Sequence, residues 1–153
     1  MTGVVVLAVA LVATAGFGVL RWRTDGNFSP SRLKLEPTRR GSTQVSADSA
    51  WSHVLAALPG ERPGERATLV QFSSAFCAPC RTARVVLSDV ASKEYGVRHV
   101  EVDAEQHLDL VRALDVRRTP TTLVLDADGH ELVRAAGAPT RQQVLAALPV
   151  TSS

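Results

Sequence analysis

Residues 67–73, ATLVQFS, constrain the fold more than any other stretch of the chain. They are dense in apolar and β-forming side chains and lack a polar face. A short run of this kind is typical of a strand that is covered on both faces. The apolar positions that follow, Ala83, Val86, Leu87 and Val90, have the spacing of one helical face. A buried strand that leads into a helix is how a βαβ unit begins.

The pattern of helices and strands continues to the end of the chain. The sequence predicts further helices at 51–58, 106–114 and 140–148 and further strands at 97–103, 121–125 and 130–136. Ser46 or Asp48 is expected to cap the first helix and Thr140 the last, and Gly129 in the turn DADG is expected to close a hairpin. Strands that alternate with helices imply parallel pairing through right-handed crossovers, and the hairpin adds an antiparallel pair. The expected fold class is α/β, with a mixed central sheet covered by helices.

The first twenty residues have a different character. Residues 3–20 are eighteen uncharged, mostly apolar residues that end at Arg21, and as a helix they would extend about 27 Å, close to the hydrocarbon thickness of a bilayer. We expect residues 1–20 to be a transmembrane anchor. A cleaved signal peptide would need a basic start, which Met1 and Thr2 do not supply. A buried core helix is the other alternative, and it lacks a cap at either end.

Charge divides the rest of the chain into two parts. Residues 21–45 hold six Lys or Arg and two acidic residues without a hydrophobic period, which predicts a basic, flexible linker. By the positive-inside rule this flank favours a single-pass protein with its C-terminal domain in the cytoplasm. Residues 46–153 hold 11 Lys or Arg and 13 Asp or Glu. The folded domain is therefore not basic, which argues against nucleic-acid binding.

Both cysteines of the chain lie just after the buried strand, in the segment CAPC. Cys77 follows the strand, Cys80 is expected in the first turn of the helix, and Pro79 stands where a helix start tolerates proline. Unpaired N–H groups and the helix dipole stabilise a thiolate there, so Cys77 is the expected nucleophile and Cys80 the resolving cysteine. A CxxC pair beside a βαβ pattern is a redox motif.

Two other uses of the cysteines are weaker. A zinc site would need two more ligands, and the remaining candidates are scattered without paired spacing: His53, His99, His107 and His130. We therefore expect no metal. A purely structural disulfide would close a very short loop, which constrains the unfolded chain little.

From Ser46 to Leu148 the chain resembles the thioredoxins, and in particular small membrane-anchored thioredoxin-like proteins of bacteria. The resemblance is carried by LVQFSSAFCAPCR and by VEVDAEQHLDLVRALDVRRTPTTLVLDADGHELVRAAGA. It implies that Pro120 is cis and packs against the cysteines. It also implies substrate contacts through the main chain, as in strand addition. The implied substrate-binding residues are Phe76, Ala78, Pro79, Thr119, Gly137 and Ala138.

The sequence departs from the family pattern at positions that affect mechanism. Phe76 replaces the usual tryptophan and Ala78 the usual glycine. Gln71 stands where the family commonly has a buried aspartate that moves the proton of the resolving cysteine, and an amide cannot accept that proton. His99 stands at the position of the family's partner lysine. Gln71 and His99 are therefore a possible proton relay, or His99 is simply bonded within the sheet.

The resemblance implies a membrane-tethered thiol–disulfide oxidoreductase, most simply a protein disulfide reductase. Its only redox cofactor would be its own Cys77–Cys80 disulfide. Its partners would be protein or small-molecule disulfides and an upstream reductant, either a thioredoxin reductase-like enzyme or a transmembrane electron carrier. The alternative is a non-enzymatic thioredoxin-like adaptor at the membrane that binds a partner beside Thr119 and Pro120.

Overall fold

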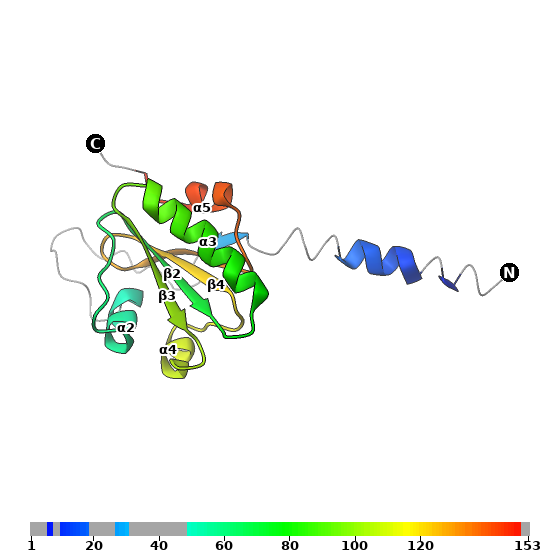
Figure 1. The fold of residues 1–153 in the computed structure, drawn as a ribbon, viewed down its shortest axis with the longest axis horizontal. Coiled ribbons are helices and arrows are strands. Elements are labelled where there is room, and N and C mark those ends of the chain that lie inside the picture. The colour runs from blue at the N-terminus through cyan, green and yellow to red at the C-terminus, as the bar shows by residue number, and fades with distance from the viewer. Residues whose placement is uncertain (1–5, 8–9, 19–26, 31–48, 151–153) are drawn as a thin grey trace.

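A computed structural model describes residues 6–7, 10–18, 27–30 and 49–150 of the chain. Two layers of helices enclose a central sheet, with α3 and α5 on one face and α2 and α4 on the other (Figure 1). The helices packed on the sheet are α2 (Ala50–Ala57), α3 (Ala78–Lys93), α4 (Leu108–Ala113) and α5 (Arg141–Ala147). The strands are β1 (Phe28–Pro30), β2 (Ala67–Ser73), β3 (Val97–Asp103), β4 (Thr121–Leu125) and β5 (Glu131–Ala136). The predicted α/β class with a mixed sheet is confirmed.

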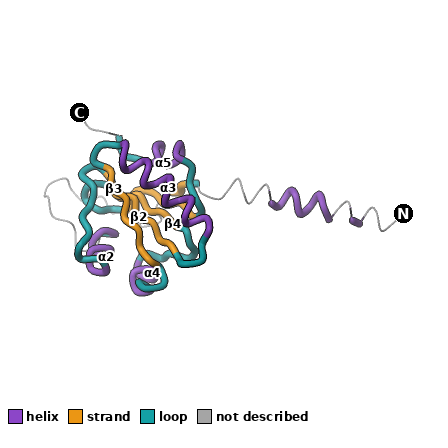
Figure 2. Tube along the Cα trace, viewed as in Figure 1, coloured by secondary structure: helices purple, strands orange, loops and turns teal. Residues whose placement is uncertain are grey.

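In the described part of the chain five strands form one sheet in the order β1-β5-β4-β2-β3, and Figure 2 shows β4, β2 and β3 side by side within it. β2 pairs with β3 in parallel and with β4 antiparallel, and β4 and β5 form the predicted hairpin. The sequence pattern predicts a crossover that would make β4 parallel to β3. That prediction is wrong, because β4 is antiparallel to β2, and β2 is parallel to β3. α4 has six residues and extends about 9 Å, whereas the seven residues of β3 span about 23 Å. The chain therefore does not return to the far end of the sheet before β4 begins.

β2 is the centre of the core, because all seven of its residues are buried. Alternate residues point to opposite helix layers, as the strand pleat requires. Val70 and Phe72 pack with α2 and α4, and Ala67 and Leu69 pack with α3 and α5. Trp51 of α2 is 2% exposed in the first of these clusters. The expectation of a strand covered on both faces is confirmed.

The ends of the elements follow local capping chemistry. The hydroxyl of Ser49 accepts a hydrogen bond from the backbone N–H of Ser52, so the cap of α2 is neither Ser46 nor Asp48. Thr140 caps α5 as predicted, and the side chain of Gln143 completes a capping box. Such caps satisfy backbone groups that the first helical turn leaves unpaired.

Strand β1 was not expected. Its three residues lie within the predicted linker 21–45, and they pair antiparallel with β5, with Phe28 opposite Ala135. Phe28 is half-buried against the α3 and α5 cluster, and the side chain of Asn27 accepts a hydrogen bond from Gln143 at 2.6 Å. A three-residue segment with one aromatic side chain is too short to show the alternating pattern of a strand. This segment pairs because β5 has an unpaired edge with free backbone hydrogen-bonding groups. Residues 21–26 and 31–45 lie outside the described residues.

The N-terminal segment bears on the predicted anchor. Residues 10–18 are helical and exposed, while residues 3–5, 8–9 and 19–20 of the expected span lie outside the described residues. No helix in the described part of the chain has the length and apolarity needed to cross a bilayer. The transmembrane anchor therefore stays a prediction.

Replacement of Gly129 is expected to destabilise the fold. Its φ is 82°, and a Cβ there would lie 2.4 Å from the Cβ of Trp51. Left-handed backbone and steric overlap together predict that Gly129→Ala lowers the free energy of unfolding by about 2–4 kcal/mol. Gly60→Ala is the matched control, since nothing lies within 4 Å of its added Cβ. Urea unfolding of both variants tests this, and equal midpoints would contradict it.

Candidate active site

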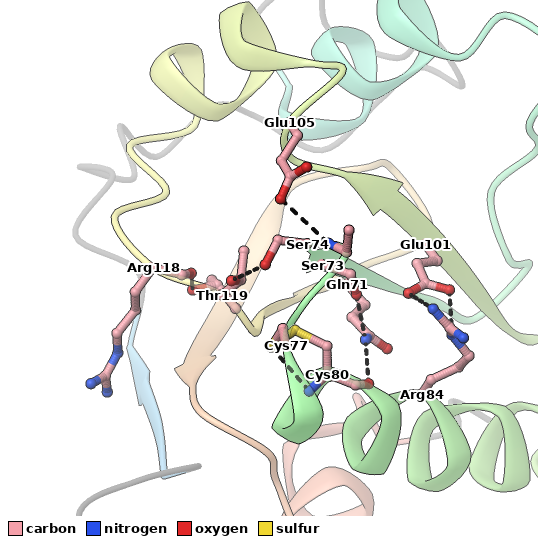
Figure 3. Close-up of a disulfide and its surroundings, with 12 residues drawn as sticks. Gln71, Ser73, Ser74, Cys77, Cys80, Arg84, Glu101, Glu105, Arg118 and Thr119 are labelled. Atoms are coloured by element: carbon pink, nitrogen blue, oxygen red, sulfur yellow. Dashed lines mark hydrogen bonds and ion pairs between the residues drawn. A yellow bond between two sulfur atoms is a disulfide. The ribbon is translucent and has the colours of Figure 1, made fainter.

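The two cysteines lie at the junction between the end of β2 and the start of α3. Cys77 is the N-cap of α3, Pro79 lies in its first turn, and the two sulfurs form a disulfide (Figure 3). The Sγ of Cys77 accepts a hydrogen bond from the backbone N–H of Cys80 at 3.2 Å. A helix N-terminus that points at sulfur favours the thiolate when the pair is reduced.

Exposure separates the roles of the two cysteines. Cys80 is 2% exposed, whereas Cys77 is partly open to solvent and its neighbour Phe76 is fully exposed. Ala78 and Pro79 are exposed beside them. An incoming disulfide can therefore reach Cys77 across an apolar surface, whereas the burial of Cys80 keeps it from direct contact with a protein substrate.

A second loop lies against the cysteine loop. The Thr119–Pro120 peptide bond is cis, and the hydroxyls of Ser74 and Thr119 share a hydrogen bond of 2.9 Å. The backbone N–H of Gly137 donates to the carbonyl of Pro120 at 2.8 Å. The structure thus brings together the three loops that sequence analysis singled out: the cysteine loop, the proline loop and the segment that begins at Gly137.

Beneath Cys80 the polar side chains form a connected group. The amide nitrogen of Gln71, which is fully buried, donates to the Oγ of Ser73 at 2.7 Å and to the backbone carbonyl of Cys80 at 2.9 Å. The Oε1 of Gln71 lies 3.1 Å from the Nε2 of His99. Because an amide oxygen can only accept, the Nε2 of His99 carries the proton. The Nδ1 of His99 then accepts from the hydroxyl of Ser88 at 3.0 Å.

This geometry places both residues of the predicted relay close to Cys80. Gln71 contacts the carbonyl of Cys80, and His99 contacts Gln71. Burial lowers the pKa of His99, outweighing the opposite effect of Glu101, and the positive charge of Arg84 lowers it further. His99 is therefore neutral at pH 7, and its contacts fit a residue that orients Gln71.

A carboxylate that sequence analysis missed lies on the same face of β3. Glu101 forms a two-bonded ion pair with Arg84 of α3, with both N–O distances 2.6 Å. Burial raises the pKa of Glu101, but hydrogen bonds from Arg84 and Ser73 outweigh it and leave the pKa below its ordinary value. The position of Glu101 could have been predicted from the two-residue period of a strand, which places it on the same face of β3 as His99.

These side chains border a surface pocket of ≈ 410 Å³ next to the disulfide. Its lining comprises Ser73, Ser74, Ala75, Cys77, Cys80, Arg81, Arg84, Glu101 and Asp103. The pocket is polar on the side of β3 and α3, so solvent can approach the otherwise buried Cys80 from this side.

Comparison with known proteins agrees with this arrangement. The model of the thioredoxin family matches residues 43–149, which is more than half of the chain. The chain belongs to the thioredoxin family. Thioredoxin-2 of Pyricularia oryzae is 26% identical over 126 residues, which cover 80% of this chain and 73% of that protein. Thioredoxin H5 of Oryza sativa subsp. japonica is 32% identical over 60 residues, which cover 39% of this chain and 44% of that protein.

Solved thioredoxin structures show the same fold. Fasciola hepatica thioredoxin matches with a TM-score of 0.51 and 26% identity over 62% of this chain and 88% of that one. A mutant thioredoxin from Halobacterium salinarum NRC-1 matches with a TM-score of 0.51 and 20% identity over 57% of this chain and 80% of that one. Some matches in sequence span less than half the length of the relative. Thioredoxin relatives and the cysteine pair together support thiol–disulfide oxidoreductase activity.

The partly buried imidazole of His99 predicts a specific pH dependence of the free energy of unfolding. His99 takes up a proton at lower pH in the folded chain than in the unfolded chain, so the unfolded state binds more protons as the pH falls below about 6.5. This contribution to the free energy of unfolding is complete above that pH and is lost progressively below it. We expect His99→Gln to lose less stability than the wild type between pH 8 and pH 5.5. If the free energies of unfolding of the two chains, measured in urea, fell equally across this range, a lowered pKa of His99 would be contradicted.

Proposed function

We propose that this protein is a protein disulfide reductase that is held at a membrane by its N-terminal apolar segment. The observation that carries the reductase proposal is the pairing of a partly exposed Cys77 at a helix N-terminus with a buried Cys80, beside the cis-proline loop. This arrangement separates a nucleophile that substrates can reach from a resolving thiol that they cannot.

The proposed reaction starts from the reduced pair. The thiolate of Cys77 attacks one sulfur of a substrate disulfide, and the other substrate sulfur leaves as a thiolate. Cys80 then attacks the Sγ of Cys77, forms the intramolecular disulfide and releases the second substrate sulfur with the electron pair. The substrate gains two electrons, and the chain reaches the disulfide form found in the structure. An upstream reductant must return both electrons before the next cycle.

The substrate-binding surface is also a proposal. Phe76, Ala78 and Pro79 provide an exposed apolar platform beside Cys77. Thr119 and the segment Gly137–Ala138 lie on the two neighbouring loops, where an extended peptide could pair with their backbone. Recognition of this kind gives limited side-chain selectivity, which suits a reductase of several protein disulfides.

Loss of the nucleophile tests the activity. With dithiothreitol as electron donor, the wild-type chain should accelerate insulin reduction, and Cys77→Ser should reduce insulin no faster than dithiothreitol alone. Reduced Cys80→Ser, freed of dithiothreitol before it is mixed with insulin, should instead accumulate a mixed disulfide through Cys77, visible on a non-reducing gel. A wild-type chain without activity would favour the adaptor alternative.

The direction of electron flow is tested by the equilibrium reduction potential of the Cys77–Cys80 pair. A reductase should give a value near about −270 mV when the chain is titrated against dithiothreitol and the thiols are labelled. A value between about −120 and −180 mV would indicate an oxidant or isomerase. That result would contradict the reductase proposal and count against a cytoplasmic domain.

The membrane proposal is supported by the eighteen uncharged residues 3–20 and by the arginines that follow them. Eighteen residues match the width of a bilayer core, and the basic flank favours a cytoplasmic domain. The full chain should remain in the membrane pellet after alkaline extraction, and a chain without residues 2–20 should not. Recovery of both chains in the supernatant would refute the anchor.

A further inference from the structure

The proposed cycle requires Cys80 to lose its proton, and the residues closest to its backbone cannot take it. Cys80 is 2% exposed, so bulk water does not surround its sulfur. Gln71 donates a hydrogen bond to its carbonyl and is an amide without basic character. His99 contacts Gln71 and reaches no atom of the Cys80 side chain in the described contacts.

The pocket beside the disulfide offers a different route. Both Cys80 and two carboxylates, Glu101 and Asp103, line it. A polar pocket of ≈ 410 Å³ has room for several water molecules, each of which needs two or more polar partners. Water in the pocket would therefore lie between Cys80 and these two acidic residues.

The two carboxylates are held differently. Asp103 accepts from the backbone N–H of Glu105 at 2.9 Å and from the side chain of Gln106 at 2.6 Å, so it is bonded to the loop after β3. Glu101 accepts from Arg84, which belongs to the same helix as Cys80. Ser73 also donates to Glu101 and accepts from Gln71. Glu101 is thus tied to both elements that hold Cys80.

We propose that Glu101, reached through water in this pocket, is the base that accepts the proton of Cys80 during resolution of the mixed disulfide. The proposal rests on the reductase function above. Arg84 and Ser73 act as positioning residues, because each bonds to the carboxylate and neither needs to touch substrate. Two hydrogen bonds from Arg84 and one from Ser73 leave one of the four acceptor positions of the carboxylate for water.

The step balances as follows. A water molecule takes the proton of the Cys80 thiol and passes one of its own to the carboxylate of Glu101. The Sγ of Cys80 bonds to the Sγ of Cys77, the bond between Cys77 and the substrate sulfur breaks, and its electron pair leaves on that sulfur. In this step the sulfur of Cys80 is oxidised and the departing substrate sulfur is reduced, whereas Cys77 was already oxidised when it formed the mixed disulfide. Glu101 then returns its proton to solvent, to which its side chain is 28% exposed.

The charged surroundings of Glu101 favour its ionised form before the step. On α3, Arg84 and Arg81 border the same pocket, and on β3 the neighbours on this face are His99 and Asp103. From β2 it faces the neutral side chains of Gln71 and Ser73. Arg84 and Ser73 hold the pKa of Glu101 below its usual range, so the carboxylate is ionised throughout the neutral pH range and, as a weak base, holds the proton only until solvent removes it.

The test follows the two sulfur-exchange steps separately. The reduced full chain is mixed with excess 2,2′-dithiodipyridine, a neutral disulfide that releases one chromophore when Cys77 attacks and a second when Cys80 resolves. Glu101→Gln should slow the second release about tenfold or more at pH 7 and leave the first unchanged. Its second-phase rate should also rise about tenfold per pH unit between pH 6 and 8, as the thiolate fraction does, while the wild-type rate changes less.

Two further variants give the test its controls. Glu94→Gln removes a carboxylate that is also paired with an arginine, Arg66, and is 30% exposed, and it should leave both phases unchanged. Arg84→Gln keeps the base but removes its cation, so the pH below which the second phase slows should move upward by about one unit. A residue that acted only on folding would not produce that shift.

Other outcomes overturn the inference. An unchanged second phase in Glu101→Gln, or equal slowing of both phases, would show that Glu101 is not the base. If the wild-type chain reduces insulin in either case, the proposed reductase function survives and this inference alone fails. A wild-type chain that releases no second chromophore and does not reduce insulin would refute both.

Discussion

The burial of β2 between two helix layers determines where every reactive group lies. Its seven residues are buried, and its side chains point alternately to the two helix layers. A shift of register by one residue would therefore move apolar side chains to the wrong layer. The end of β2 therefore fixes the cysteine loop and the first turn of α3. Gln71 reinforces this junction through its hydrogen bond to the carbonyl of Cys80.

The polar face behind Cys80 depends on the same strand. Gln71 and Ser73 alternate on β2 with apolar residues of the opposite layer, and in the parallel register Gln71 lies opposite Glu101 on β3. An unpaired polar group at this depth would cost about 1–3 kcal/mol, so the hydrogen bonds between these side chains are part of the fold as well as of the site. The proposed resolution by Cys80 and the stability of the sheet therefore depend on the same hydrogen bonds.

Much of this arrangement could be predicted from sequence where the signal was local and periodic. The bounds of β2, β3 and β4, the cap at Thr140 and the position of the cysteines follow from short patterns. The antiparallel direction of β4 and the pairing of β1 could not be predicted in the same way, because they depend on how far α4 reaches and on which edge stays open. Glu101 was missed because its importance comes from Arg84, seventeen positions away in the sequence, and only the packed structure brings the two together.

Strand β1 bears on where the chain can be shortened without exposing the edge of the sheet. It covers the outer edge of β5 through its pairing with residues Val133–Ala135. A shortened chain that began at residue 46 would keep both cysteines and the proline loop, yet the backbone donors and acceptors of β5 would face solvent. An open edge of this kind invites pairing with a strand of another molecule. Self-association of such a fragment would then reflect the missing strand, whereas the longer chain carries its own protection against it.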